Sequence, residues 1–113
     1  MSDCLFCKII ERKIPARKVY EDEKVFVIED INPQAPTHVL ILPKKHLEGL
    51  NTAKAEDAEI IGYCQLIAAK LGRERGIEDG YRTVYNVGPK SGQSVFHLHL
   101  HLLGGRVLRW PPG

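Results

Sequence analysis

The fold is best read outward from the segment Val95-Phe96-His97-Leu98-His99-Leu100-His101-Leu102-Leu103. Apolar residues alternate with three histidines along it, and a period of two is that of a β-strand. Successive strand side chains point to opposite faces, so the apolar residues face a core and the imidazoles share the other face, about 6.5–7 Å apart. A packed strand would hold these imidazoles rigidly, as a catalytic site requires.

The remaining pattern predicts an antiparallel α+β fold. We expect a short helix over Leu5 to Glu11 with Asp3 near its cap, and a long helix from about Ala53 to Arg75, capped by Asn51 or Thr52 and ended by Gly76. Strands are expected at 19–20, 25–31, 38–42, 81–87 and 95–103. Because strands outnumber helices and hairpin spacings dominate, the sheet is expected to be antiparallel, with about five strands.

Composition excludes several classes of protein. The chain has 113 residues, 43% hydrophobic and 27% charged, which is ordinary for one globular domain over residues 1–113. Lys and Arg number 16 against 14 Asp and Glu, and a net charge of +2 is too small to indicate nucleic-acid binding. No apolar run is long enough for a membrane span, and Met1-Ser2-Asp3-Cys4 lacks the features of a signal peptide, so a cytoplasmic location is expected.

The three alternating histidines have two other possible explanations besides a catalytic site. The strand could be half-exposed, with His simply as its polar residue, but three of the chain's five His fall within five positions. A metal site made of these three alone is disfavoured, because neighbours at i and i+2 on a strand rarely converge on one ion.

The loop before this strand favours phosphate chemistry. It runs from Gly88 to Ser94, and its two glycines allow backbone N–H groups to converge on an anion. Ser94 adds a hydroxyl and Asn86 an amide. A glycine loop alone is more often a turn, but beside three imidazoles it indicates a site where His attacks phosphorus and forms a covalent intermediate.

These motifs together resemble a known family. The stretch from Gly92 to Arg106 resembles the signature of the histidine triad (HIT) family. The segment from Asp30 to His38 and the ending Trp110-Pro111-Pro112-Gly113 resemble its HINT branch, the purine nucleoside phosphoramidases. The resemblance covers Leu5 to Gly113 and implies a HIT-like fold, hydrolysis of purine nucleoside 5′-phosphoramidates, and a homodimer with Trp110 near the active site.

The resemblance also implies catalytic roles. His99 would attack the α-phosphorus and carry the nucleotidyl group. His101, which can carry charge beside a phosphate, would contact the phosphate and stabilise developing charge. His38 would bond the other ring nitrogen of the nucleophile and fix its tautomer. Ser94 would bond the nitrogen of the leaving amine.

A nucleotide site is implied around these residues. Asp30 would hold the ribose hydroxyls, and Asn86, Gly92 and Gln93 the phosphate oxygens. The base would lie between apolar side chains, for which core packing is an equal explanation and which should discriminate weakly between adenine and guanine: Phe6, Ile9, Ile14, Ile28 and Ile31.

The pair Cys4-x-x-Cys7 has two interpretations. The total of three cysteines is odd and disfavours a disulfide framework, and two cysteines near a terminus need have no function. Some bacterial HIT proteins, however, resemble this pattern and hold a structural zinc. The resemblance then implies a closed site of Cys4, Cys7, His46 and His97, with no position left for water.

Three other functions are considered. A dinucleoside polyphosphate hydrolase is disfavoured by Ser94 and the Trp-Pro-Pro ending. Nucleotidyl transfer to a sugar phosphate is disfavoured because that related family has Gln in place of the last histidine, here His101. A nucleotide-binding regulatory protein with incidental catalysis stays open.

Overall fold

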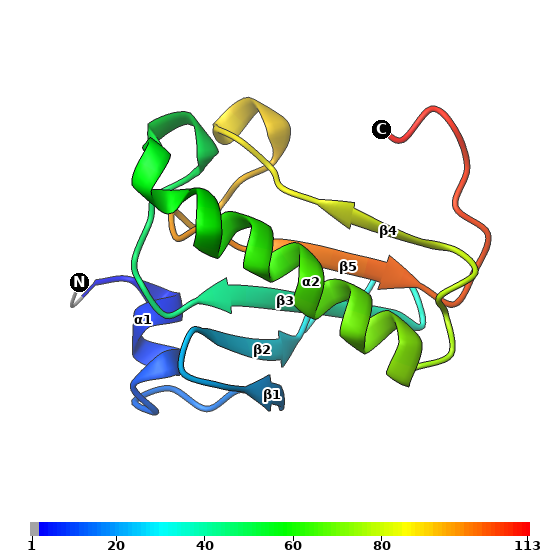
Figure 1. Ribbon diagram of the computed structural model, residues 1–113, viewed down its shortest axis with the longest axis horizontal. Helices are drawn as coiled ribbons and strands as arrows, with labels where there is room; N and C mark the ends of the chain where they lie inside the picture. Colours follow the sequence, from blue (N-terminus) through cyan, green and yellow to red (C-terminus); the bar gives the residue numbers. More distant parts are fainter. Residues whose placement is uncertain (1–2) are drawn as a thin grey trace.

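A five-stranded antiparallel sheet forms the centre of the computed structural model, which describes residues 3–113 (Figure 1). Met1 and Ser2, part of the stretch that argues against a signal peptide, lie outside the described residues. The strand order is β1-β2-β3-β5-β4, with β1 Lys18–Glu21, β2 Val25–Glu29, β3 Thr37–Pro43, β4 Tyr81–Val84 and β5 Leu100–Gly104. This confirms the predicted sheet.

Two α-helices and three 3-10 turns accompany the sheet within the described residues. Helix α1 spans Leu5–Ile10 and α2 spans Ala58–Glu74, while the turns η1, η2 and η3 cover Leu50–Thr52, Ala55–Asp57 and Pro89–Ser91. The prediction of one long and one short N-terminal helix is therefore confirmed. None of the helices within residues 3–113 has the length and apolar character of a membrane span.

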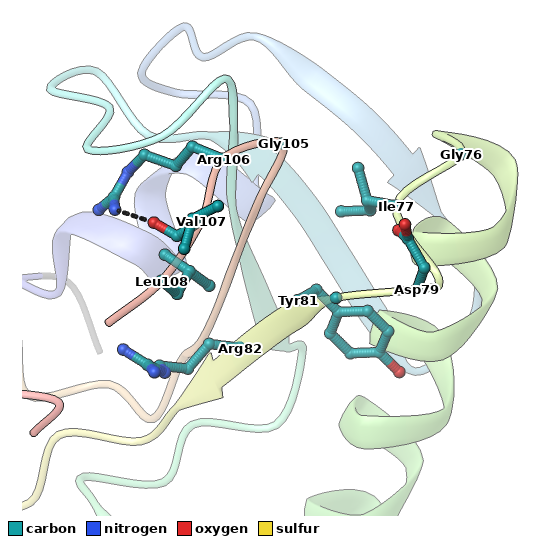
Figure 2. A pocket seen from close by; sticks show the side chains of 10 residues that line it. Gly76, Ile77, Asp79, Tyr81, Arg82, Gly105, Arg106, Val107 and Leu108 are labelled. Atoms are coloured by element: carbon teal, nitrogen blue, oxygen red, sulfur yellow. Dashed lines mark hydrogen bonds between the residues drawn. The ribbon is translucent and has the colours of Figure 1, made fainter. Parts of the chain in front are cut away.

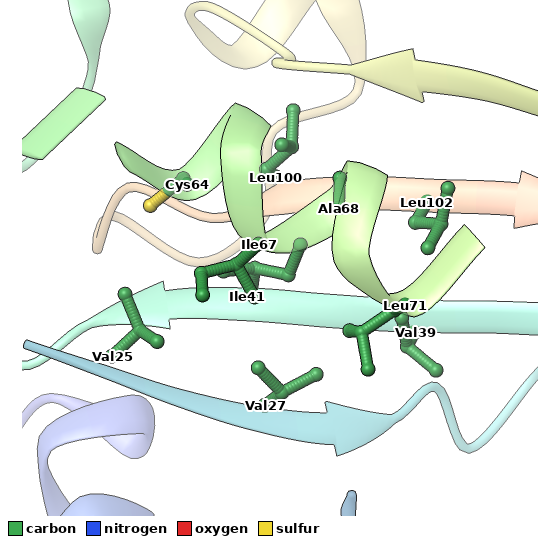
Figure 3. Packing of buried hydrophobic residues seen from close by; sticks show 10 residues of the cluster. All are labelled: Val25, Val27, Val39, Ile41, Cys64, Ile67, Ala68, Leu71, Leu100 and Leu102. Carbon is green, nitrogen blue, oxygen red and sulfur yellow. The ribbon is translucent and has the colours of Figure 1, made fainter. Parts of the chain in front are cut away.

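One face of the sheet packs against α2, which lies across the front of the sheet in Figure 1. Residues at alternate strand positions meet the apolar stripe of the helix, and Figure 3 shows them interdigitating: Val25, Val27, Val39, Ile41, Leu100 and Leu102 with Cys64, Ile67, Ala68 and Leu71. The predicted burial of Cys64 is confirmed, and burial raises the pKa of its thiol to about 11. This face is a dry core, as the two periodicities require.

The other face carries a second apolar cluster, built with α1. Its buried members are Phe6 and Ile9 of α1 with Phe26, Ile28, Leu40 and Leu42 of β2 and β3. Register places His101 of β5 beside Leu40, and His38 beside Leu103. Apolar packing and imidazoles therefore share this face.

The predicted strand over 95–103 is too long at its start, because β5 begins at Leu100. Its partner β3 ends at Pro43, which has no N–H to donate to a ladder. The Pro43 carbonyl accepts a hydrogen bond from the ring of His97 instead, at 2.7 Å. Phe96, expected to face the core, is half exposed.

The helix starts also differ from the predictions. Cys4, not Asp3, caps α1, and its sulfur accepts from the Cys7 N–H at 3.3 Å. Asn51 and Thr52 lie in a separate turn, and α2 begins only at Ala58. The Asp57 carboxylate accepts from the Lys54 N–H at 2.9 Å and closes the turn before the helix. The end predicted at Gly76 is confirmed, since this glycine follows the helix with φ of 69°.

Candidate functional site

A cavity of about 410 Å³ opens between α1, the end of β2, and the chain around Asn86, Ser94 and His99. We call it the site cavity. It brings together nearly every residue predicted to bind a nucleotide: Phe6, Ile9, Ile14, Ile28, Asp30, Ile31, Asn86, Gly92, Ser94, His99 and His101. Ile31 lies at its rim and is fully exposed, whereas Phe6 and Ile9 are buried.

Some lining residues are not in the predicted set. These are Leu5, Pro15, Ala16, Arg17, Glu29, Leu40 and Val95. The period of two could have identified Leu40, because it lies two positions after His38 and therefore on the same face of the strand. Residues 15–17 have no periodicity that would have placed them.

Gln93, predicted as a phosphate ligand, does not line the site cavity, and that role stays a prediction. The side chain is buried and holds the loop together. Its amide nitrogen donates to the Glu48 carbonyl at 2.8 Å and to the Val95 carbonyl at 3.2 Å, and its oxygen accepts from the Gly88 N–H at 2.8 Å. Gln93 therefore shapes the loop that presents Gly92 and Ser94.

His99 is held by the backbone of its own segment. Its Nδ1 lies 2.7 Å from the carbonyl oxygen of His97, and only a protonated Nδ1 can make that bond. Burial lowers the pKa of His99, so the ring is neutral at pH 7 and its Nε2 carries a lone pair. The expectation that His38 fixes this tautomer is wrong, because the partner is a main-chain carbonyl.

His38 instead bonds to His101. The Gln34 N–H donates to His38 Nδ1 at 3.0 Å, so a neutral His38 has its proton on Nε2. That nitrogen lies 2.9 Å from Nδ1 of His101 and 3.3 Å from the Asp30 carboxylate. A proton donated to His101 Nδ1 requires that His101 hold its own proton on Nε2.

The two imidazoles of the site cavity are therefore opposite tautomers. His99 presents a lone pair on Nε2 and His101 an N–H on Nε2. Burial, with His99 and His38 adding to it, lowers the pKa of His101 to about 4. A charged His101 is thus not supported in the ligand-free site, where this ring is a neutral hydrogen-bond donor.

A second cluster lies beside the cavity. Its donor atoms belong to Cys4, Cys7, His46 and His97, and all lie within 4.8 Å of one another. Nδ1 of His97 is 3.3 Å from the Cys4 sulfur, 3.6 Å from the Cys7 sulfur and 3.2 Å from Nδ1 of His46. Tetrahedral zinc with ordinary bond lengths sets its ligands about 3.3–3.8 Å apart. We call these four side chains the Cys2His2 cluster.

The protonation of the cluster also suits a metal. The ring of His97 donates from Nε2 to the Pro43 carbonyl at 2.7 Å, and burial lowers its pKa to about 4. Its Nδ1 is therefore unprotonated and points at the two sulfurs. A ligating histidine usually donates its other N–H to a carbonyl in this way. The residues present fit zinc in donor type and spacing.

A larger cavity of about 610 Å³ lies where the α2–β4 turn meets the segment after β5 (Figure 2). Its lining contains no His or Cys, and its Arg82 and Arg106 donate to backbone carbonyls. The candidate catalytic histidines line the smaller site cavity, which is therefore the better candidate for the functional site.

Comparisons with known proteins agree with this geometry. The HIT domain model matches residues 11–108. The chain is 54% identical to a 14 kDa zinc-binding protein of Zea mays, over 99% of this chain and 89% of that protein. Among solved structures, a HIT family hydrolase from Legionella pneumophila is 49% identical with a TM-score of 0.96, covering 98% of this chain and all of that one. A histidine triad nucleotide-binding protein from Candida albicans is 31% identical, with a TM-score of 0.81, covering 96% and 83%. The chain therefore belongs to the histidine triad family.

Proposed function

We propose that the protein hydrolyses purine nucleoside 5′-phosphoramidates through a nucleotidyl-histidine intermediate. The observation that carries the proposal is the pair of opposite tautomers in the site cavity. A lone pair on His99 suits attack on phosphorus, and an N–H on His101 suits a phosphate oxygen. The hydrolase and nucleotide-binding names of similar structures support the same class of reaction.

The chemistry proceeds in two displacements. Nε2 of His99 bonds to the α-phosphorus as the phosphorus–nitrogen bond to the amine breaks. The leaving amine takes up a proton from solvent, and the attacking water returns one proton in the second displacement. The Ser94 hydroxyl, which lines the cavity, hydrogen-bonds that nitrogen. Water then attacks the phosphorus, the bond to His99 breaks, and a nucleoside monophosphate is released.

The walls of the cavity suit the rest of a nucleotide. Asp30 stands at the end of β2, where a carboxylate can accept from ribose hydroxyls. The buried side chains of Phe6, Ile9 and Ile28 offer an apolar slot for a base. These contacts bury apolar surface and do not distinguish the hydrogen-bonding groups of the base. Adenine and guanine nucleotides should therefore bind with similar affinity.

The test is a comparison of kcat/KM on an adenosine 5′-phosphoramidate and on a dinucleoside polyphosphate. We expect kcat/KM of at least about 10⁴ M⁻¹s⁻¹ on the phosphoramidate and a far lower value on the polyphosphate. Ser94→Ala should lower kcat/KM on the phosphoramidate and so bring it closer to kcat/KM on the polyphosphate. A higher value on the polyphosphate would favour the sister hydrolase, and negligible rates on both would favour a regulatory nucleotide-binding protein.

We further propose that the Cys2His2 cluster holds a structural zinc ion. The four donors would fill the tetrahedral coordination of the ion and leave no open position for water. The ion would therefore cross-link Cys4 and Cys7 to His46 and His97. The zinc-binding name of the Zea mays relative supports this choice of metal. Metal analysis of protein purified without chelator should find one zinc per chain, and well under one would contradict the proposal.

A homodimer in the cytoplasm completes the proposal. Strand β4 is an edge of the sheet, and exposed apolar side chains include Leu66, Val107 and Trp110. Both features support a partner surface. Light scattering after size exclusion should give twice the chain mass, and a monomer at micromolar concentration would contradict dimerisation. The cytoplasmic location stays a prediction.

A further inference from the structure

The segment that carries the proposed nucleophile lies outside the sheet ladder. Strand β5 begins at Leu100, so His97 and His99 precede its first paired residue. The Leu98 N–H donates to the Leu47 carbonyl at 2.6 Å. The orientation of the His97 carbonyl must therefore be held mainly by that bond and by the His97 side chain.

The side chain of His97 is held from two directions. Its Nε2 donates to the Pro43 carbonyl at 2.7 Å, at the end of β3. Its Nδ1 faces the sulfurs of Cys4 and Cys7. The ring is fully buried, so it has no room to turn while these contacts persist.

One residue thus belongs to both sites. The imidazole of His97 is part of the Cys2His2 cluster, and its carbonyl accepts from Nδ1 of His99 at 2.7 Å. That carbonyl decides which nitrogen of His99 keeps the lone pair. An imidazole in water prefers the proton on Nε2, which would leave no lone pair on the nitrogen that faces phosphorus.

Phe6 gives a second connection between the two sites. It lies between Cys4 and Cys7 in α1, a helix too short to be stable without tertiary contacts. Its buried ring meets the ring of His97 edge-on at 5.9 Å and that of His99 at 5.0 Å, between centroids. Anchoring both cysteines therefore also fixes the wall against which His99 rests.

We infer that the Cys2His2 cluster, when it holds its metal, is a positioning device for the nucleophile: through the His97 carbonyl it keeps the proton of His99 on Nδ1. His97 and Phe6 are then positioning residues. The inference rests on the proposed function only in calling His99 the nucleophile. The tautomer of His99 is a property of the resting protein and can be measured separately.

The experiment compares protein loaded with zinc, stripped by a chelator, and reloaded. Nitrogen-15 NMR of the His99 ring, assigned with His99→Gln, reports which nitrogen carries the proton. We expect Nδ1–H in loaded protein, a shift toward Nε2–H after stripping, and recovery on reloading. In parallel, kcat should fall roughly 10-fold or more per folded molecule, with KM changed much less, because correct orientation is needed mainly in the transition state.

Controls separate positioning from stability. Ile67→Val loosens the α2 face without touching either site and should leave the His99 tautomer and kcat unchanged. If stripped wild type loses its circular dichroism, His46→Asn at graded zinc concentrations replaces it, with folded fraction measured alongside. The inference is overturned if the His99 proton stays on Nδ1 without metal, or if activity follows the folded fraction alone. Persistent turnover in His99→Ala would instead remove the proposed function while leaving the tautomer result standing.

Discussion

The two faces of the sheet are built from alternate residues of the same strands, yet their contents differ. The face under α2 is closed by aliphatic side chains that are almost fully buried (Figure 3). The face toward α1 has fewer apolar side chains and carries His38 and His101 among them. A long helix can cover a sheet face completely, whereas a helix of six residues leaves a cavity. Function here depends on incomplete covering of one face, and stability depends on complete covering of the other.

The largest expected effect is a loss of kcat from a substitution on the α1 face. The stability of the fold should be unchanged. His99→Ala should lower kcat on the order of 1,000-fold or more, because it removes the nucleophile. Binding of a nucleoside monophosphate, measured by calorimetry, should stay within a few-fold, since the cavity walls remain. Ile67→Val, in the core under α2, serves as the control. Substantial turnover in His99→Ala would remove the assignment.

The second effect is on the α2 face and should spare chemistry. Leu71→Ala leaves a cavity in the dry core and should destabilise the fold by about 2–5 kcal/mol. Urea unfolding measures this loss, and kcat should be normal where the protein is still folded. A variant that lost activity before losing structure would show that the two faces are not separable.

A smaller effect concerns the point where α2 is tied to the β1–β2 turn. Asp22 accepts from the hydroxyls of Tyr20 and Tyr63 and from two backbone N–H groups. Burial raises its pKa, but these donors outweigh it and lower the pKa to about 2. Asp22→Asn should therefore cost about 1–2 kcal/mol at pH 7.

The pH dependence of that effect has a definite sign. The folded pKa of Asp22 lies below its ordinary value of 3.8, so its stabilisation is complete above pH 4 and is lost as pH falls toward 2. Thermal melts of wild type and Asp22→Asn should differ at pH 7 and converge near pH 2. Parallel curves over the whole range would contradict this account of the turn.

The smallest expected effect is a difference in nucleotide affinity between variants of a buried and of an exposed residue of the site cavity. Ile31 is fully exposed, so Ile31→Ala should change nucleotide affinity by about twofold at most. Ile9→Ala removes a buried wall residue and should weaken binding several-fold. Equal losses in the two variants would mean that the base does not lie against α1.

Periodic patterns in the sequence predicted the regular elements of the fold. The alternation through Leu100 and Leu102 and the helical stripe through Ile67 and Leu71 identified the sheet, α2 and the dry core. The start of β5 was missed because Pro43, a residue of the partner strand, ends the ladder. No pattern within residues 95–103 carries that information.

Residue types in the site were predicted better than their partners. Resemblance brought His38, His99 and His101 together, but it paired the wrong two rings. Hydrogen bonds to main-chain groups, the His97 carbonyl and the Gln34 N–H, decide both tautomers. Main-chain donors and acceptors are the same at every residue except proline, so a sequence does not show which of them a side chain will meet.

The central claim is that an imidazole of the α1 face becomes covalently bonded to phosphorus. The stereochemical course tests it most directly, using a nucleoside phosphoramidate made chiral at phosphorus with sulfur and hydrolysed in oxygen-18 water. Two in-line displacements predict overall retention of configuration at phosphorus. Inversion would mean that water attacks directly, and would contradict a nucleophilic His99.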